Sequence, residues 1–157
     1  MTRSSEQSSA TLYIASDHAG FELKKYLLNS PSLTAATKSW EWQDLGPQNA
    51  DRVDYPDYAK KLCEQLLKAP AGSFGILICG SGQGMAMTAN RNKGIRAALA
   101  WNEESASLSR AHNNANILCL GARLLEPSVA VKITEIFLRT QVEGGRHIDR
   151  VEKIDRL

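Results

Sequence analysis

Short apolar runs take turns with amphipathic segments along the chain. A run of four to eight apolar residues bounded by turn residues is typical of a buried strand. The run 75–79 is rich in Ile and free of charge, so it fits a strand covered on both faces. The run 39–45 alternates apolar and polar residues instead, as an edge strand does. The pattern predicts strands at 11–16, 39–45, 75–79, 95–101 and 117–120.

The segments between these runs have the spacing of amphipathic helices. In 21–28 the apolar residues form one face, with lysines between them. Pro56 and Pro127 stand where the first turn of a helix tolerates proline. Residues 29–38, rich in Ser and Thr, and residues 46–52 are predicted to be surface loops. Helices are predicted at 21–28, 54–67, 86–91, 102–112, 127–138 and 148–154.

This order of elements predicts the fold. Strands separated by helices of about 10 to 15 residues form parallel β-α-β units. Right-handed crossovers place helices on both faces of one sheet. We therefore expect an α/β protein with a single three-layer α/β/α Rossmann-like domain over 11–157, built on a five-stranded parallel sheet. Residues 1–10 are polar and Ser-rich, and are expected to form a flexible tail.

Composition and charge narrow the class of protein. The 157 residues are 43% hydrophobic and 23% charged, as in a globular domain. A formal net charge of +2 gives no reason to expect a nucleic acid or a membrane surface as partner. No apolar run approaches the roughly 18 residues of a membrane span. An odd count of cysteines fits a reducing compartment, so a cytoplasmic enzyme or binding domain is expected.

The strongest chemical signal lies where the third predicted strand ends. In order, the residues there are Cys79, Gly80, Ser81, Gly82, Gln83 and Gly84. Glycines at this spacing let the backbone turn sharply and aim several N–H groups at one point, where an anion can bind. A thiol beside such an anion site suits catalysis. The alternative is a tight strand-to-helix turn next to a buried cysteine.

Other motifs do not fit. A dinucleotide fingerprint needs a glycine where Met85 stands, and a nucleophile elbow needs one where Cys79 stands. Cys63 and Cys119 lack zinc-site spacing and are expected to be packing residues. The three histidines lie far apart in sequence. No cofactor and no metal site are expected.

Candidate side chains follow three of the predicted strands. Asp17 and His18 come after the first, Cys79 ends the third, and Arg123 lies just past the fifth. The carboxyl ends of parallel strands meet at one edge of the sheet, where ligands of such folds bind. These groups are therefore expected to converge on one site.

Several blocks of the chain resemble the ribose-5-phosphate isomerase B family, which shares its fold with the galactose-6-phosphate isomerase subunits. The blocks are ASDHAG at 15–20, DYPDYA at 54–59, CGSGQGM at 79–85, AHNNAN at 111–116, LGAR at 120–123, and GGRH at 144–147 with Arg150. They follow the family's order over nearly all of 11–151. The resemblance implies a metal-independent aldose–ketose isomerase of phosphosugars. It also implies a homodimer with active sites at the subunit interface, with a dimer of dimers as a further option.

The resemblance assigns roles to individual residues. Cys79 stands at the family's base position, where it would take a proton from the carbon beside the carbonyl. His112 would open the furanose ring, with Asp17 acting from across the interface. Taken alone, His112 has the alternative of a helix C-terminal histidine that interacts with the dipole. Ser81 would relay protons between sugar oxygens, and Asn113 would hold a hydroxyl.

Phosphate binding is assigned to basic residues. Arg146 and Arg150 are four apart, so on a helix they share one face, and the planar fork of Arg suits phosphate oxygens. From spacing alone, a solvated face neutralised by nearby acidic residues is the competing interpretation. The resemblance adds Arg123 and His18 to the phosphate site.

The remaining substrate contacts are expected from the glycine-rich turn. The backbone N–H groups of Gly80, Gly82 and Gly84 would hold the enediolate oxygen. Tyr55 could line the sugar pocket or serve only in a helix cap. No role is predicted for His147.

The expected function is therefore the interconversion of ribose 5-phosphate and ribulose 5-phosphate. Two alternatives stay open. One is an isomerase of a six-carbon phosphosugar, such as allose or galactose 6-phosphate. The other is a non-catalytic phosphosugar-binding protein that keeps the same turn and arginines.

Overall fold

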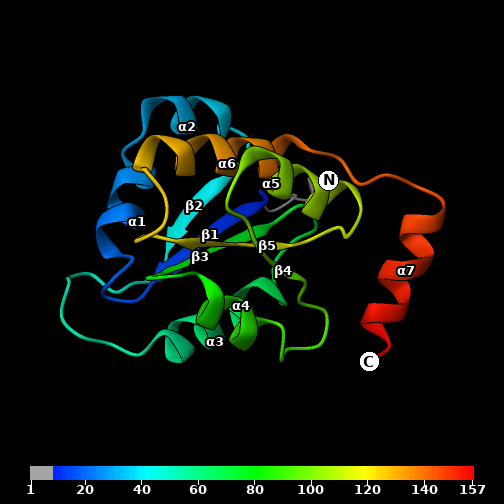
Figure 1. Cartoon of the computed structure of the whole chain (residues 1–157), viewed down its shortest axis with the longest axis horizontal. Coiled ribbons are helices and arrows are strands. Elements are labelled where there is room, and N and C mark those ends of the chain that lie inside the picture. Colours follow the sequence, from blue (N-terminus) through cyan, green and yellow to red (C-terminus); the bar gives the residue numbers. More distant parts are fainter. Residues whose placement is uncertain (1–8) are drawn as a thin grey trace, which may run out of the picture.

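The computed structural model describes residues 9–157, and its centre is a parallel sheet (Figure 1). The strands are β1 (Thr11–Ser16), β2 (Glu41–Asp44), β3 (Phe74–Cys79), β4 (Ala97–Leu99) and β5 (Ile117–Gly121). Their order across the sheet is β2-β1-β3-β5-β4, and every pairing is parallel. The predicted five-stranded parallel α/β fold is confirmed, and β3 lies at its centre, flanked by β1 and β5.

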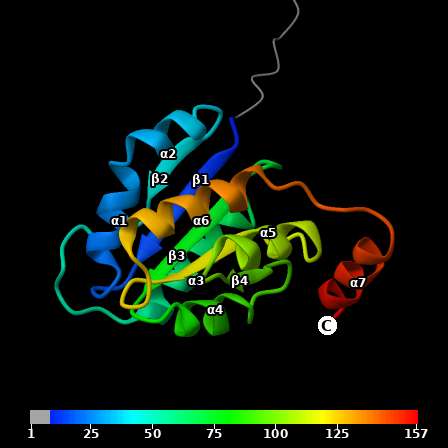
Figure 2. The same cartoon turned by 45° about the horizontal axis from the view of Figure 1, so that its top comes forward.

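Helices cover both faces of this sheet. They are α1 (Phe21–Leu28), α2 (Pro31–Ala36), α3 (Tyr55–Leu66), α4 (Gln83–Ala89), α5 (Glu103–Ala111), α6 (Pro127–Arg139) and α7 (Arg146–Asp155). Figures 1 and 2 show α1, α2, α5 and α6 on one face and α3 and α4 on the other. Successive strand residues alternate between the two layers, so that Ile76 and Ile78 pack under α1 and α6, whereas Leu77 and Cys79 face α3 and α4.

One prediction about the connections is wrong. Residues 29–38 were expected to form a loop, but they contain the short helix α2. The Ser30 side chain accepts a hydrogen bond from the Leu33 N–H, and Pro31 occupies the first turn. Leu33 is fully buried against the core. A cap, a proline at a favourable position and one anchoring leucine outweigh the loop-like composition.

The last helix, α7, is set apart from the rest of the molecule (Figures 1 and 2). Its buried residues are His147 and Val151. It lies at the opposite end of the sheet from the turns that follow β1 and β3. Across residues 9–157, no helix combines the length and the apolar character needed to cross a membrane. The proposed tail over 1–10 falls mostly outside the described residues, and its flexibility stays a prediction.

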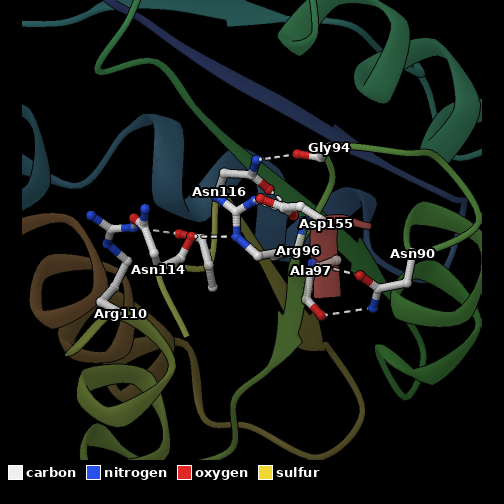
Figure 3. A network of polar contacts seen from close by, with 9 residues as sticks. Asn90, Gly94, Arg96, Ala97, Arg110, Asn114, Asn116 and Asp155 are labelled. Atoms are coloured by element: carbon white, nitrogen blue, oxygen red, sulfur yellow. Dashed lines mark hydrogen bonds and ion pairs between the residues drawn. The ribbon is translucent and has the colours of Figure 1, made fainter. Parts of the chain in front are cut away.

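A polar network holds the far end of α7 (Figure 3). Nη1 of Arg96 lies 2.8 and 3.0 Å from the two carboxylate oxygens of Asp155. Nε of the same guanidinium donates to the Asn114 carbonyl oxygen at 3.0 Å. The Arg96 backbone N–H donates to Oδ1 of Asn116 at 2.8 Å. The end of α7 is thereby tied to the start of β4 and to the turn between α5 and β5.

Candidate active site

A pocket of about 460 Å³ opens where β1 and β3 end. It is lined by Asp17, Tyr55, Cys79, Gly80, Ser81, Gly84, Met87, Arg123 and Leu124. The predicted convergence of Asp17, Cys79 and Arg123 is therefore found in the structure. A larger hollow of about 550 Å³ lies beside the N-terminal half of α3, but none of the predicted site residues lines it.

The Cys79 sulfur lies at the turn that begins α4. Sγ accepts a hydrogen bond from the Gly82 N–H at 3.1 Å, and the side chain is only 4% exposed. Gly82 has φ +77, and a Cβ on it would lie 2.9 Å from the Leu120 carbonyl carbon. A residue with a side chain would therefore be strained there. The turn aims an N–H at the sulfur, and such a donor interacts favourably with negative charge on it.

Tyr55 and Arg123 border the same turn from either side. A Cβ on Gly84 would lie 2.6 Å from the Tyr55 ring, so glycine lets the ring approach the backbone. The backbone N–H of Arg123 donates to the Gly80 carbonyl oxygen at 2.9 Å, and this contact fixes where the arginine side chain begins, at the edge of the pocket. Ser81 Oγ accepts a hydrogen bond from the Gln83 N–H at 3.3 Å. The pocket thus combines a thiol, a hydroxyl, a carboxylate and a cation.

Asp17 and His18 lie in the turn after β1. Oδ1 of Asp17 accepts a hydrogen bond from the Gly20 N–H at 2.9 Å, and the Asp17 N–H donates to the Ile78 carbonyl oxygen at 3.0 Å. These contacts hold the carboxylate beside Cys79. His18 does not line the pocket, since its Nδ1 lies 3.0 Å from the Val53 carbonyl oxygen.

The other predicted site residues do not reach this pocket within one chain. His112 is the C-cap of α5, and Asn113 next to it borders a separate hollow of about 260 Å³. Arg146 and Arg150 are exposed on α7. One chain therefore carries two separate groups of candidate residues, one around Cys79 and one around His112 and α7.

Residue spacing gives no sign of a cluster that forms around His112. The rings of His112 and His147 stack face to face, with centroids 4.1 Å apart and planes at 1°. Oε2 of Glu143 lies 3.6 Å from Nε2 of His112 and 3.5 Å from Nε2 of His147. His112 and His147 are 35 residues apart in sequence, and the fold brings them together. Their approach depends on the Glu143 N–H donating to the Ala111 carbonyl oxygen at 2.8 Å, a contact that residue spacing does not reveal.

The ionisable groups differ in their surroundings. Burial raises the pKa of the Cys63 thiol to about 11, and burial also raises the pKa of the Cys119 thiol well above its ordinary value. Both side chains are fully buried, as predicted for packing residues. Burial lowers the pKa of His147, and the positive charge of His112 acts in the same direction.

Comparison with known proteins agrees with this architecture. A family model described as Ribose/Galactose Isomerase matches residues 12–154. The chain is 44% identical over 149 residues to the probable ribose-5-phosphate isomerase B of Mycoplasma genitalium, covering 94% of this chain and 95% of that protein. It is 40% identical over 141 residues to ribose-5-phosphate isomerase B of Escherichia coli, covering 88% and 89%.

Solved structures are similar over the same length. A ribose 5-phosphate isomerase from Thermotoga maritima superposes with a TM-score of 0.85 at 47% identity, covering 94% of this chain and 99% of that one. Ribose-5-phosphate isomerase B from Mycoplasma genitalium, with bound ribulose-5-phosphate, superposes with a TM-score of 0.85 at 44% identity, covering 94% and 95%. Matches of this length and identity show that the chain belongs to the ribose/galactose isomerase family, in its ribose-5-phosphate isomerase B group.

Proposed function

We propose that this protein interconverts ribose 5-phosphate and ribulose 5-phosphate, with Cys79 as the base. The observation that carries the proposal is the Cys79 sulfur, which borders the pocket and accepts the Gly82 N–H. Relatives over nearly the whole chain are named ribose-5-phosphate isomerase B, which supports a pentose phosphate isomerase. A six-carbon phosphosugar is the closest alternative substrate.

The isomerisation moves one carbon-bound proton. Cys79 takes the proton from C2 of the open-chain aldose, and the electron pair of that bond forms the enediolate. Returning the proton to C1 gives the ketose, while Ser81 carries a proton from O2 to O1. The backbone donors of the turn stabilise the enediolate oxygen, each good donor contributing roughly a hundred- to a thousandfold in rate. A positioned base adds on the order of a hundred- to ten-thousandfold.

Ribose 5-phosphate is mostly a closed furanose, so the ring must open first. The bond between C1 and the ring oxygen breaks. His112 gives a proton to the ring oxygen, and Asp17 takes the proton of the C1 hydroxyl, so that an aldehyde forms. An acid and a base on opposite sides of the sugar fit these two transfers.

The complete site requires two copies of the chain. The pocket holds Asp17, Cys79 and Arg123, whereas His112 and the α7 arginines lie in the other group. Leu124 and Met87 on the pocket rim are 70% and 67% exposed, as expected of apolar residues that a second subunit covers. In a symmetric homodimer, the α7 end of one protomer closes the pocket of its partner. The arginines would then join Arg123 at the substrate phosphate.

An assay of the purified protein tests this function. Ribose 5-phosphate, allose 6-phosphate and galactose 6-phosphate are offered with a chelator present, and ketose formation is measured. We expect turnover to be fastest with ribose 5-phosphate. Cys79→Ala should abolish turnover while phosphosugar binding by calorimetry persists. Binding without turnover by the wild-type protein would instead identify a phosphosugar-binding protein.

A further inference from the structure

The His112 cluster has a geometry that goes beyond packing. The two imidazole planes are parallel within 1°, and one carboxylate oxygen of Glu143 is nearly equidistant from both Nε2 atoms. His147 has a side-chain exposure of 11%, whereas His112 has 38% and can meet a ligand. The buried ring of His147 therefore lies behind the accessible ring of His112, and the Glu143 carboxylate lies beside both Nε2 atoms.

Parallel rings do not suit a shared metal ion. The lone pair of an imidazole nitrogen lies in the ring plane, so the two lone pairs of the stack run side by side rather than meeting. The carboxylate of Glu143, in contrast, can attract a proton on either ring. The geometry therefore favours a single proton on the pair of imidazole rings, next to the Glu143 carboxylate.

The charges around the stack decide which ring carries that proton. Burial lowers the pKa of His147, and His112, Arg146 and Arg150 act in the same direction, whereas Glu143 raises it. His147 is thus kept neutral and presents an uncharged aromatic face to His112. A cation over an uncharged aromatic face is stabilised by the ring electrons.

We propose that Glu143 and His147 are positioning residues that hold His112 as the protonated acid for opening the sugar ring. This inference rests on the proposed function, because it assigns a reason for the acidity and orientation of His112 in that reaction. His147 fixes the plane of the His112 ring by stacking. Glu143 supplies the counter-charge. Neither residue touches the substrate.

The test separates ring opening from isomerisation. 4-Deoxyribose 5-phosphate lacks the hydroxyl that closes the furanose, so it reaches the base without ring opening. Glu143→Gln should lower kcat/KM for ribose 5-phosphate by roughly three- to fivefold, and His147→Ala by about three- to tenfold. Glu143→Gln should leave kcat/KM for the 4-deoxy sugar within about twofold. His147→Ala also loosens the start of α7, so it should lower kcat/KM for the 4-deoxy sugar, but less than kcat/KM for ribose 5-phosphate.

Two further variants exclude a purely structural effect. His147→Phe keeps a flat ring behind His112 and should restore most of the activity lost in His147→Ala. Glu152→Gln removes the same charge from an exposed position on α7, where Glu152 pairs with Arg156, and should change nothing. Equal losses on both sugars, or kcat/KM for ribose 5-phosphate in Glu143→Gln that matches the value in Glu152→Gln, would overturn the inference while the isomerase function stood. A wild-type protein inactive on every aldose phosphate would overturn the proposed function itself.

Discussion

The three cysteines show how placement decides reactivity at the scale of single residues. All three lie in the layer between the sheet and α3 and α4, and Cys79 borders the pocket at the ends of β1 and β3. Cys63 and Cys119 have no exposed surface, and burial raises the pKa of both thiols. A raised pKa leaves little thiolate, the form that reacts.

Alkylation should therefore discriminate among the cysteines. Native protein treated with iodoacetamide near pH 8 should be modified at Cys79 well before Cys63 or Cys119, because only the first is reached from solvent through the pocket. Peptide mass spectrometry over time measures each site. Ribulose 5-phosphate should slow the reaction at Cys79. Alkylation of Cys63 at the same rate as Cys79 would contradict the burial of Cys63.

His147 should make the stability depend on pH. Its pKa in the folded protein is lowered by burial and by neighbouring positive charge, relative to the ordinary value of 6.5. Below pH 6.5 the unfolded chain binds a proton at this histidine, whereas the folded chain does not until the pH is lower. The free energy of unfolding is therefore higher above pH 6.5 and decreases as the pH falls. Urea titrations at about pH 7.5 and about pH 5.5 should show a smaller loss of stability in His147→Phe than in the wild type. The same loss in both would show that His147 is not the group responsible.

At the scale of elements, α7 depends on a few contacts at its two ends. Stacking of His147 holds its start, and the Arg96–Asp155 pair holds its end (Figure 3). Arg96 is 15% exposed, so this pair is better shielded than the other α7 pair, between Glu152 and Arg156. Elements with little buried area open more readily than the core. The position of Arg146 and Arg150 therefore rests on these contacts.

Asp155→Asn should loosen α7 without unfolding the domain. Losing one partner leaves the shielded Arg96 without its counter-charge, and the amides of α7 should exchange faster with deuterium. KM for ribose 5-phosphate should rise severalfold with a smaller change in kcat, because the arginines are assigned to the phosphate. The exposed Asp149→Asn is the matched control on the same helix. Unchanged exchange in Asp155→Asn would mean that other contacts hold α7.

The elements also show where sequence reasoning works and where it stops. Periodicity predicted the strands and the long helices correctly, because one-sided or two-sided burial repeats along each segment. It missed α2, which is stabilised by the Ser30 cap, by Pro31 in the first turn and by the buried Leu33. The pocket was predictable, because parallel strands bring Asp17, Cys79 and Arg123 to one edge. The approach of His147 to His112 was not, because it depends on how the 140–145 segment folds back on α5.

At the scale of the whole molecule, the group around Cys79 and the group around His112 are separate, so the proposed homodimer can be tested by mixing variants. If each site combines the Cys79 side of one protomer with the His112 side of its partner, then two inactive variants can complement each other. A mixed dimer of Cys79→Ala and His112→Asn contains one site with both changes and one site with neither. Random exchange of protomers should therefore restore about a quarter of wild-type activity on ribose 5-phosphate, since half of the dimers are mixed and each has one intact site.

The control for this experiment mixes variants that change the same side. Cys79→Ala and Cys79→Ser share the altered position, so no mixed dimer contains an intact site and activity should stay at the level of the separate variants. The two variants are co-expressed with different affinity tags, and purification on one tag and then on the other isolates the mixed dimer. There the expected activity is about half that of the wild type, since one of its two sites is intact. Absence of recovery in a purified mixed dimer would mean that His112 serves the Cys79 of its own chain, and that the two residue groups approach each other within one protomer.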